Sequence, residues 1–203
     1  MNNPGTATTA TGSGVRVLAD GDWGAVTALE AAVYGPLGLS EGERRLRSRA
    51  RPSPGTCLVV ESGGALAGYL VALPYPAFGA PDLARPESPG ADGTAAPSRN
   101  LHLHDLVIVP ELRRRGLARN VLDRLIRTAR TRGYERLSLV AVGGSDAFWS
   151  SCGFAAHPSV PVPAGYGRSA VYMSLPLTAG LRARERTGRS TRKGIDRPDR
   201  PVL

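Results

Sequence analysis

Residues 101–118 read LHLHDLVIVPELRRRGLA and join an apolar stretch to an arginine-rich one. The first nine residues predict a β-strand because leucine and β-branched residues are enriched there, and Pro110 ends it since proline has no N–H for the ladder. A helix is expected next, because apolar side chains recur every three or four residues from Leu117 to Ala129, and Gly133 is placed to cap its end. The junction is typical of a phosphate-binding site, since the first N–H groups of a helix lack intrahelical partners and its dipole favours anions.

The residues just before this helix also suit a phosphate ligand. Gly116 would let a ligand approach the backbone where a Cβ would obstruct it. The run Arg113, Arg114 and Arg115 adds positive charge that can bind pyrophosphate in bidentate fashion. The stretch therefore predicts a site for a ligand that carries a pyrophosphate group.

The segment Arg113-x-x-Gly116-x-Ala118, which follows a Val-Pro strand end, resembles motif A of the Gcn5-related N-acetyltransferase (GNAT) superfamily. A second strand over 137–142 and the segment FWSSCGF at 148–154 follow, and the latter is similar to the family's Phe-Tyr-x-x-x-Gly-Phe helix end. The resemblance covers residues 15–176 and implies one α/β (α+β) domain, with a central mixed, largely antiparallel sheet flanked by helices. The alternative is an ordinary β-α-β unit with a basic, exposed helix.

Local signals give the remaining elements. Asp20 or Asp22 can cap a first helix, and Ser40 with Glu43 forms a capping-box pattern for a second helix that ends near Ala50. The expected strands are 15–18, 56–61, 65–73 and 170–175, the middle two forming a hairpin.

Length and charge favour a single domain with polar ends. At 203 residues the chain fits one domain, with residues 1–14 expected as a disordered leader and 177–203 as a basic, disordered tail. Residues 181–203 hold eight basic and three acidic residues, so the tail carries +5 of the net charge of +9. The domain itself is then only mildly basic, which counts against a nucleic-acid partner. The tail is expected to be a solvated segment, with an interaction arm as the alternative.

The two cysteines and the hydropathy point to the cytoplasm. Cys57 and Cys152 cannot form a disulfide framework and lack the spacing of a zinc site, so we expect no metal and a reducing compartment. The first residues lack the charged and apolar regions of a secretory signal. No apolar run approaches the ~20 residues that cross a bilayer, so no membrane partner is expected.

The segment Pro74–Asn100 is rich in proline, glycine, alanine and serine and is longer than a hairpin loop. Such a segment is either a lid over a functional site or a linker. The part over 74–78 carries two aromatic residues and is expected to pack, whereas 87–98 is expected to be mobile.

Two histidines lie two residues apart on the strand before motif A. His102 and His104 are expected to share a face with Leu106 and Ile108, while Asp105 points the other way. An imidazole is a suitable base at neutral pH. The tract is similar to that of the arylalkylamine N-acetyltransferases, which implies a histidine relay with His102 as the primary base. The alternatives are two polar groups satisfied in the core, or a metal pair that lacks a third ligand.

The resemblance implies acetyl-CoA as the co-substrate and assigns its site. Strand backbone would bind the pantetheine arm, a backbone N–H near Val107 or Ile108 would meet the oxyanion, and the amides from Arg114 through Arg119 would hold the pyrophosphate. The expected CoA-binding residues are Leu106, Val107, Ile108, Arg114, Arg115, Gly116, Leu117, Ala118 and Arg119.

The sequence departs from the family at the general acid. Trp149 stands where the family often has a tyrosine, and an indole cannot deliver a proton to a thiolate. Glycines stand where an asparagine is often found on the preceding loop. The acid therefore stays unassigned among water and four side chains, unless the thiolate leaves unaided. The four are Ser145, Cys152, Tyr166 and Tyr172, of which Cys152 is also an alternative covalent nucleophile.

Together these features predict an acetyl-CoA-dependent N-acetyltransferase that acts on the primary amine of a small molecule. The partners would be the CoA thioester and the amine, joined by direct attack in a ternary complex. Three alternatives share the fold: an acyltransferase with an aminoacyl-tRNA donor, a catalytically silent CoA-binding regulatory module, and a protein-directed acetyltransferase.

Overall fold

The computed structural model describes residues 13–87 and 98–177. Most of the expected leader, most of the expected tail and part of the 74–100 segment lie outside these ranges. The first described strand begins at Ser13, inside the expected leader, and Leu177 is only 4% exposed in the core.

A seven-stranded sheet in the order β1-β2-β3-β4-β5-β7-β6 forms the centre of the described structure. Neighbouring strands are antiparallel except for β4 and β5, which are parallel. This confirms the predicted mixed, largely antiparallel sheet. The strands are β1 Ser13–Val17, β2 Leu58–Ser62, β3 Ala65–Pro74, β4 Asn100–Ile108, β5 Arg136–Ala141, β6 Ala155–Ala156 and β7 Val171–Pro176. The helices are α1 Trp23–Tyr34, α2 Gly42–Ala50, α3 Leu117–Thr131 and α4 Asp146–Ser151.

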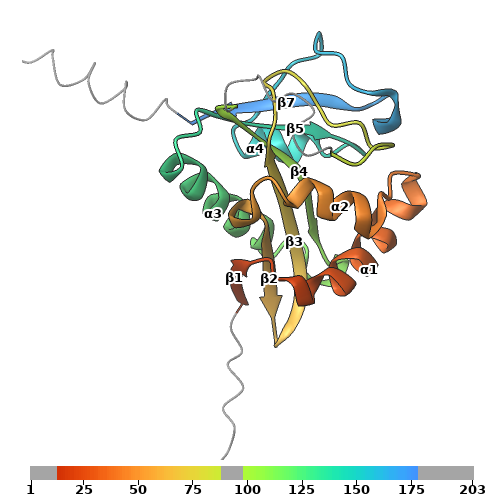
Figure 1. Cartoon of the computed structure of the whole chain (residues 1–203), viewed down its shortest axis with the longest axis vertical. Coiled ribbons are helices and arrows are strands. Elements are labelled where there is room, and N and C mark those ends of the chain that lie inside the picture. Colours follow the sequence, from red (N-terminus) through yellow and green to blue (C-terminus); the bar gives the residue numbers. More distant parts are fainter. Residues whose placement is uncertain (1–12, 88–97, 178–203) are drawn as a thin grey trace, which may run out of the picture.

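Helices cover both faces of the sheet, and Figure 1 shows α1 and α2 together on one side of β3 and α3 on the other. The α3 face holds the larger apolar core, to which α4 contributes Phe148 and Trp149. The smaller core on the opposite face joins α1 and α2 to β2 and β3 through Trp23 and Leu46. As the apolar repeat predicts, α3 buries one face and exposes its arginines. Its buried residues are Leu117, Val121, Leu122, Leu125 and Ala129.

The predicted capping box at the start of α2 is wrong. The hydroxyl of Ser40 donates instead to the Glu30 carboxylate, at 2.7 Å, and Glu41 occupies the N-cap position without a side-chain cap bond. Asp22 does precede α1, but its carboxylate accepts from the Ala19 N–H and pairs with Arg16. Ser40 therefore binds a residue of another helix, and Asp22 binds the residues just before it, in place of capping the helix that each precedes.

A β-bulge in β4 changes the faces that its side chains occupy. Val71 pairs with Asp105 and Ala72 with Leu103, so His104 is an extra residue opposite β3. A bulge reverses the alternation beyond it. His102, His104 and Asp105 therefore lie on the α1–α2 side, while Leu106 and Ile108 pack into the α3 core. The prediction that the histidines share a face with Leu106 and Ile108, and that Asp105 points away from them, is wrong for this reason.

Candidate active site

The two parallel strands at the centre of the sheet separate from one another. β4 and β5 pair only over Asn100–His102 and 136–138, although both continue beyond that point. A groove of about 700 Å³ lies at this opening, with walls from β4, β5, α4 and the loop that leads into α3. Splayed strands leave backbone N–H and C=O groups free to bind an extended ligand, because no neighbouring strand occupies them.

The structure brings together the residues that motif A singled out. Of the nine expected CoA-binding residues, all except Arg115 line the groove. The groove has two ends of different character. Arg113, Arg114 and Arg119 lie with the start of α3, and apolar side chains such as Leu103 and Leu139 lie between the strands.

The loop before α3 is shaped to expose its backbone. Gly116 has a φ of +79° and Arg114 a φ of 62°, both in the left-handed region. A Cβ built on Gly116 would meet nothing within 4 Å, so the backbone there faces open space at the edge of the groove. The Arg119 guanidinium donates to the Ser151 hydroxyl at 2.8 Å and so joins α3 to α4. Exposed first-turn amides beside arginines fit a pyrophosphate group.

His104 belongs to a buried chain of polar groups that ends in Arg49. Its Nε2 bonds to one oxygen of Glu41, and the other oxygen accepts from Arg49 at 2.6 Å. The side chains of His104, Glu41 and Arg49 are 3%, 4% and 0% exposed. Among the described residues, His104 Nδ1 has no hydrogen-bond partner although it is buried.

The negative charge of Glu41, which Arg49 stabilises, fixes the tautomer of a neutral His104. Burial alone would raise the pKa of Glu41, but the hydrogen bond from His104 and the charges of His104 and Arg49 outweigh it and lower that pKa. The ionised carboxylate can only accept, so a neutral His104 must donate from Nε2 and carry its lone pair on Nδ1. Nδ1 is then the atom able to accept a proton.

His102 has a different environment. It is 1% exposed, and its Nδ1 lies 3.0 Å from the Ser138 hydroxyl. Burial, followed by the charges of His104 and Arg49, lowers the pKa of His102 well below its ordinary value. His102 lies with its ring centroid 6.3 Å from that of His104, and it lines neither the groove nor the small cavity described next.

A second, smaller cavity of about 40 Å³ adjoins the groove on the α1–α2 side, and we call it the acceptor pocket. Tyr34, His104, Val140 and Val142 line both spaces, so the two meet at His104. The other residues of the acceptor pocket are Glu30, Leu39, Glu41, Leu83, Asp105 and Tyr166.

Asp105 is a buried carboxyl group of the acceptor pocket. It accepts hydrogen bonds from the hydroxyls of Tyr34, at 2.6 Å, and Tyr69. Burial raises the pKa of Asp105 to about 6, in spite of the charge of His104 and these two bonds, which lower it. Asp105 is therefore mostly ionised at neutral pH and protonates in mild acid.

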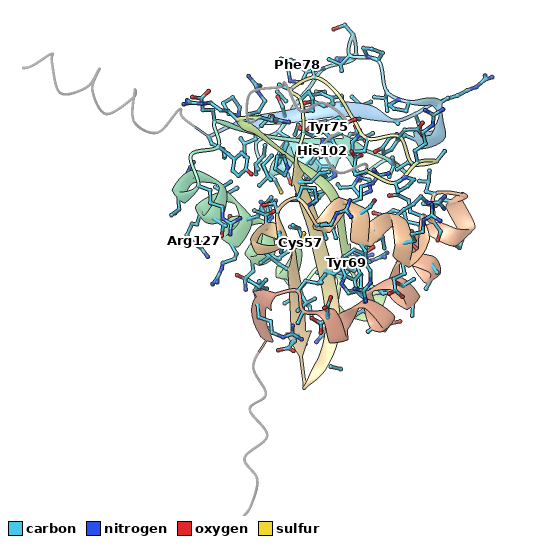
Figure 2. The ribbon with its side chains drawn as sticks, viewed as in Figure 1. Cys57, Tyr69, Tyr75, Phe78, His102 and Arg127 are labelled. Atoms are coloured by element: carbon cyan, nitrogen blue, oxygen red, sulfur yellow. The ribbon has the colours of Figure 1, made fainter. Side chains whose placement is uncertain are left out.

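The described part of the 74–100 segment docks over this side of the molecule. Arg49 anchors it by pairing with Glu87 at 2.6 Å and by donating to the carbonyl groups of Asp82, at 2.7 Å, and Arg85, at 3.1 Å. Leu83 thereby reaches the acceptor pocket. At the other end of the segment, Figure 2 shows Tyr75 beside His102 and Phe78 further out. The prediction that 74–78 packs holds only in part, because Tyr75 is half-buried whereas residues 76–78 are exposed, Phe78 at 48%. The mobile part expected over 87–98 lies mostly outside the described residues.

The candidates for a general acid are spread apart. Trp149 is 7% exposed and packs edge-on against Phe148 and Phe154, which is a core role. Ser145 lines the groove and Tyr166 the acceptor pocket, whereas Tyr172 and Cys152 line neither. The hydroxyl of Tyr172 accepts the Phe78 N–H at 2.9 Å.

Sequence reasoning missed Glu41, Arg49, Tyr34 and Tyr69. One signal was present for Arg49, because it shares a helix face with Leu46 and Ala50, the buried residues of α2. A charged residue on a buried face requires a partner. Nothing local connects Glu41 to His104, which lies 63 residues away in the chain.

The described residues show two further absences. Within 13–87 and 98–177, no three His, Cys, Asp or Glu side chains gather in a way that could hold a metal ion. In the same ranges, no helix is both long enough and apolar enough to cross a membrane.

Comparison with known proteins agrees with this architecture. The model of the acetyltransferase (GNAT) family matches residues 23–154, and the chain belongs to that family. Comparison with curated proteins gives no match for this chain.

Solved structures share the fold at low sequence identity. Ard1 from Thermoplasma volcanium is 16% identical with a TM-score of 0.59, over 81% of this chain and 97% of that one. The loading GNATL domain of CurA from Lyngbya majuscula is 14% identical with a TM-score of 0.63, over 82% of this chain and 98% of that domain. The PaiA N-acetyltransferase from Thermoplasma acidophilum, solved in complex with coenzyme A, is 12% identical with a TM-score of 0.57, over 81% of this chain and 99% of that one.

Proposed function

We propose that this protein is an acetyl-CoA-dependent N-acetyltransferase that acts in the cytoplasm on the primary amine of a small molecule. The observation that carries the proposal is the position of His104, where the groove and the acceptor pocket meet. The buried, unpartnered Nδ1 of this residue would stand between a donor in the groove and an amine in the pocket.

The bound co-substrate would supply an activated acetyl thioester. The first-turn amides of α3, with Arg114 and Arg119, would hold its pyrophosphate, and the free edge of β4 would align its pantetheine arm. An N–H of β4 near Val107 or Ile108 would stabilise the oxyanion, because both residues line the opening between the strands. Holding both reactants in one complex allows direct attack without an enzyme-bound intermediate. Cys152 lines neither space, which disfavours it as a nucleophile.

We further propose that His104 is the primary base and that His102 assists it. An amine must lose its proton before it can attack, and Glu41 leaves Nδ1 of His104 able to accept one. His102 has a pKa far below its ordinary value because of burial, and it lines neither space. It packs beside His104 and bonds to Ser138, so it would assist by holding the His104 ring in place, but it does not face the reactants directly.

The leaving group needs less help than the nucleophile. A thiol with a pKa near ~8.5 leaves as a thiolate far more readily than an alcohol would, so solvent can supply its proton. Ser145, which lines the groove, can donate a hydrogen bond to the sulfur. Burial raises the pKa of Tyr166 far above its ordinary value, which makes this hydroxyl a poor acid but a stable hydrogen-bonding group.

The size of the acceptor pocket supports a small molecule over a protein. Leu83 lies against the loop that carries Tyr166, since a Cβ on Gly165 would stand 3.7 Å from that of Leu83. The 74–87 part of the segment thus narrows the path that a peptide chain would need.

An acceptor screen tests the proposal. Purified protein, acetyl-CoA and a panel of small amines, peptides and an aminoacyl-tRNA would be assayed for thiol release and for the acetylated product. We expect acetylation of at least one small amine and none of the peptides. Turnover of peptides alone would support the protein-directed alternative. CoA binding without any turnover would support the silent module.

A further inference from the structure

The acceptor pocket has an unusual set of polar groups. Two buried polar atoms that line it have no partner among the described residues: His104 Nδ1 and the Tyr166 hydroxyl. Both side chains are at least nine-tenths buried, at 3% and 8% exposed. Buried polar atoms are normally satisfied by protein, water or ligand, so these two are satisfied by what enters the cavity, which is water in the free protein and a polar group of the acceptor in the complex.

The pocket is also acidic. Among the described residues, its lining includes the carboxyl groups of Glu30, Glu41 and Asp105 together with His104, and no arginine or lysine. Arg49 offsets one of these charges, but it also pairs with Glu87. Glu30 is 1% exposed and, within 13–87 and 98–177, receives only neutral donors, the Ser40 hydroxyl and the Glu41 N–H. Glu30 therefore has no cationic partner among the described residues, and a cation that enters the pocket would be attracted to this wall.

The volume limits what can enter. A cavity needs about 10–15 Å³ of free volume to hold one water molecule, so the 40 Å³ of the acceptor pocket holds roughly three or four non-hydrogen atoms. If the reacting nitrogen lies at His104, the pocket accommodates a short chain and one small polar end group.

We propose, on the basis of the function proposed above, that the acceptor is a short diamine whose second ammonium group lies in the acceptor pocket. The reacting amine would donate to His104 Nδ1. The far ammonium would lie among Glu30, Asp105 and the Tyr166 hydroxyl, which satisfies the second unpartnered atom. An amino acid of the same length would place a carboxylate there, which the acidic wall would repel. A monoamine would place a methyl group there, which would leave the carboxyl groups of the wall without a cation.

The size of the preference follows from Coulomb's law. A unit charge about 6 Å from a carboxylate at an effective dielectric constant near ~20 corresponds to an affinity change of about 100-fold, and partial screening reduces this to about 10-fold. We therefore expect a short diamine to bind on the order of 10- to 100-fold more tightly than the monoamine of equal chain length.

Calorimetry on the dead-end complex tests this without turnover. CoA is first titrated into the protein, and the CoA-saturated protein is then titrated with three amines of equal carbon count: propanediamine, propylamine and β-alanine. The expected order of affinity is propanediamine, then propylamine, then β-alanine. Glu30→Gln can still accept from the Glu41 N–H while its amide donates to the Ser40 hydroxyl, and it should reduce the preference for the diamine over the monoamine by about 10-fold. Tyr166→Phe should weaken the diamine alone and should not impair folding.

The outcomes separate the two proposals. Equal affinities, preference for β-alanine, or binding of none of the three amines would overturn the diamine acceptor. In each case acetyl transfer to another amine in the screen would leave the proposed function standing. Failure of CoA to bind in the first titration would instead overturn the proposed function.

Discussion

Gly116→Ala offers a test of the CoA site with an internal control at the other end of the same helix. Gly116 precedes α3 and Gly133 follows it, and both have a φ of +79° with nothing within 4 Å of a Cβ. Only Gly116 lines the groove. The two alanine variants therefore impose the same backbone strain at two positions, one beside the expected pyrophosphate and one remote from it.

The expected magnitudes follow from these geometries. An alanine in the left-handed region costs roughly 1–2 kcal/mol, and the lower entropy of the unfolded chain returns about 0.4–1 kcal/mol. Each variant should thus lose about 1 kcal/mol of unfolding free energy, or about 2–4 °C in Tm. At Gly116 the added methyl group also obstructs the phosphate. Loss of one hydrogen bond to a charged group, worth about 1.5–3 kcal/mol, weakens CoA binding by about 10- to 100-fold.

The assay is calorimetric titration of CoA into both variants, with thermal unfolding of each as the measure of stability. We expect matched Tm values, a weakened Kd for Gly116→Ala and an unchanged Kd for Gly133→Ala. Equal CoA affinity in two folded variants would refute the reasoning that α3 begins at the pyrophosphate site.

Three further outcomes are expected. Glu41→Gln should lower kcat on the order of 100-fold with little change in KM for CoA, because it removes the carboxylate that fixes the His104 tautomer. The control variant Glu43→Gln, on the exposed side of α2, should leave kcat unchanged. The pKa of Asp105 is raised from 3.8 to about 6, so the protonated carboxyl group stabilises the fold below about pH 4, and this contribution is lost as the pH rises through 6. The expected result is measured by urea titration of the wild type and of Asp105→Asn. The difference between their unfolding free energies, wild type minus variant, should fall by about 3 kcal/mol as the pH rises from below about 4 to above about 6. Leu83→Ala should widen the acceptor pocket, so the KM for a small amine should rise while the CoA Kd from calorimetry stays unchanged.

The parts of the fold that were predictable have local causes. The strand end at Pro110, the apolar face of α3 and the glycines at its two ends are set by residues close to one another in sequence, and the structure shows them as expected. The same holds for the hairpin of β2 and β3. The sheet as a whole was predictable only through resemblance to the GNAT superfamily.

The parts that were not predictable depend on distant partners. The bulge at His104 is defined by pairing with β3, so no alternation rule within β4 could place Asp105 beside the histidines. Ser40 carries a capping signal, but a buried carboxylate on α1 binds its hydroxyl. Glu41 follows it and becomes the partner of a histidine 63 residues away. The chemistry of the site depends on these contacts, which is why the sequence identified the histidines but not the group that orients them.

The dependence of kcat/KM on pH for His104→Ala and His102→Ala tests the central claim most directly, with an amine found in the acceptor screen. We expect His104→Ala to lower kcat/KM by about 100- to 10,000-fold at pH 7 and to recover partly at high pH, where more of the amine is neutral. The acidic limb of the profile of kcat/KM against pH should move to higher pH. His102→Ala should have a smaller effect, and the double variant should be less than additive because the two act together. A folded His104→Ala protein, or a folded double variant, that retains the wild-type rate at pH 7 would contradict the account and leave solvent as the base.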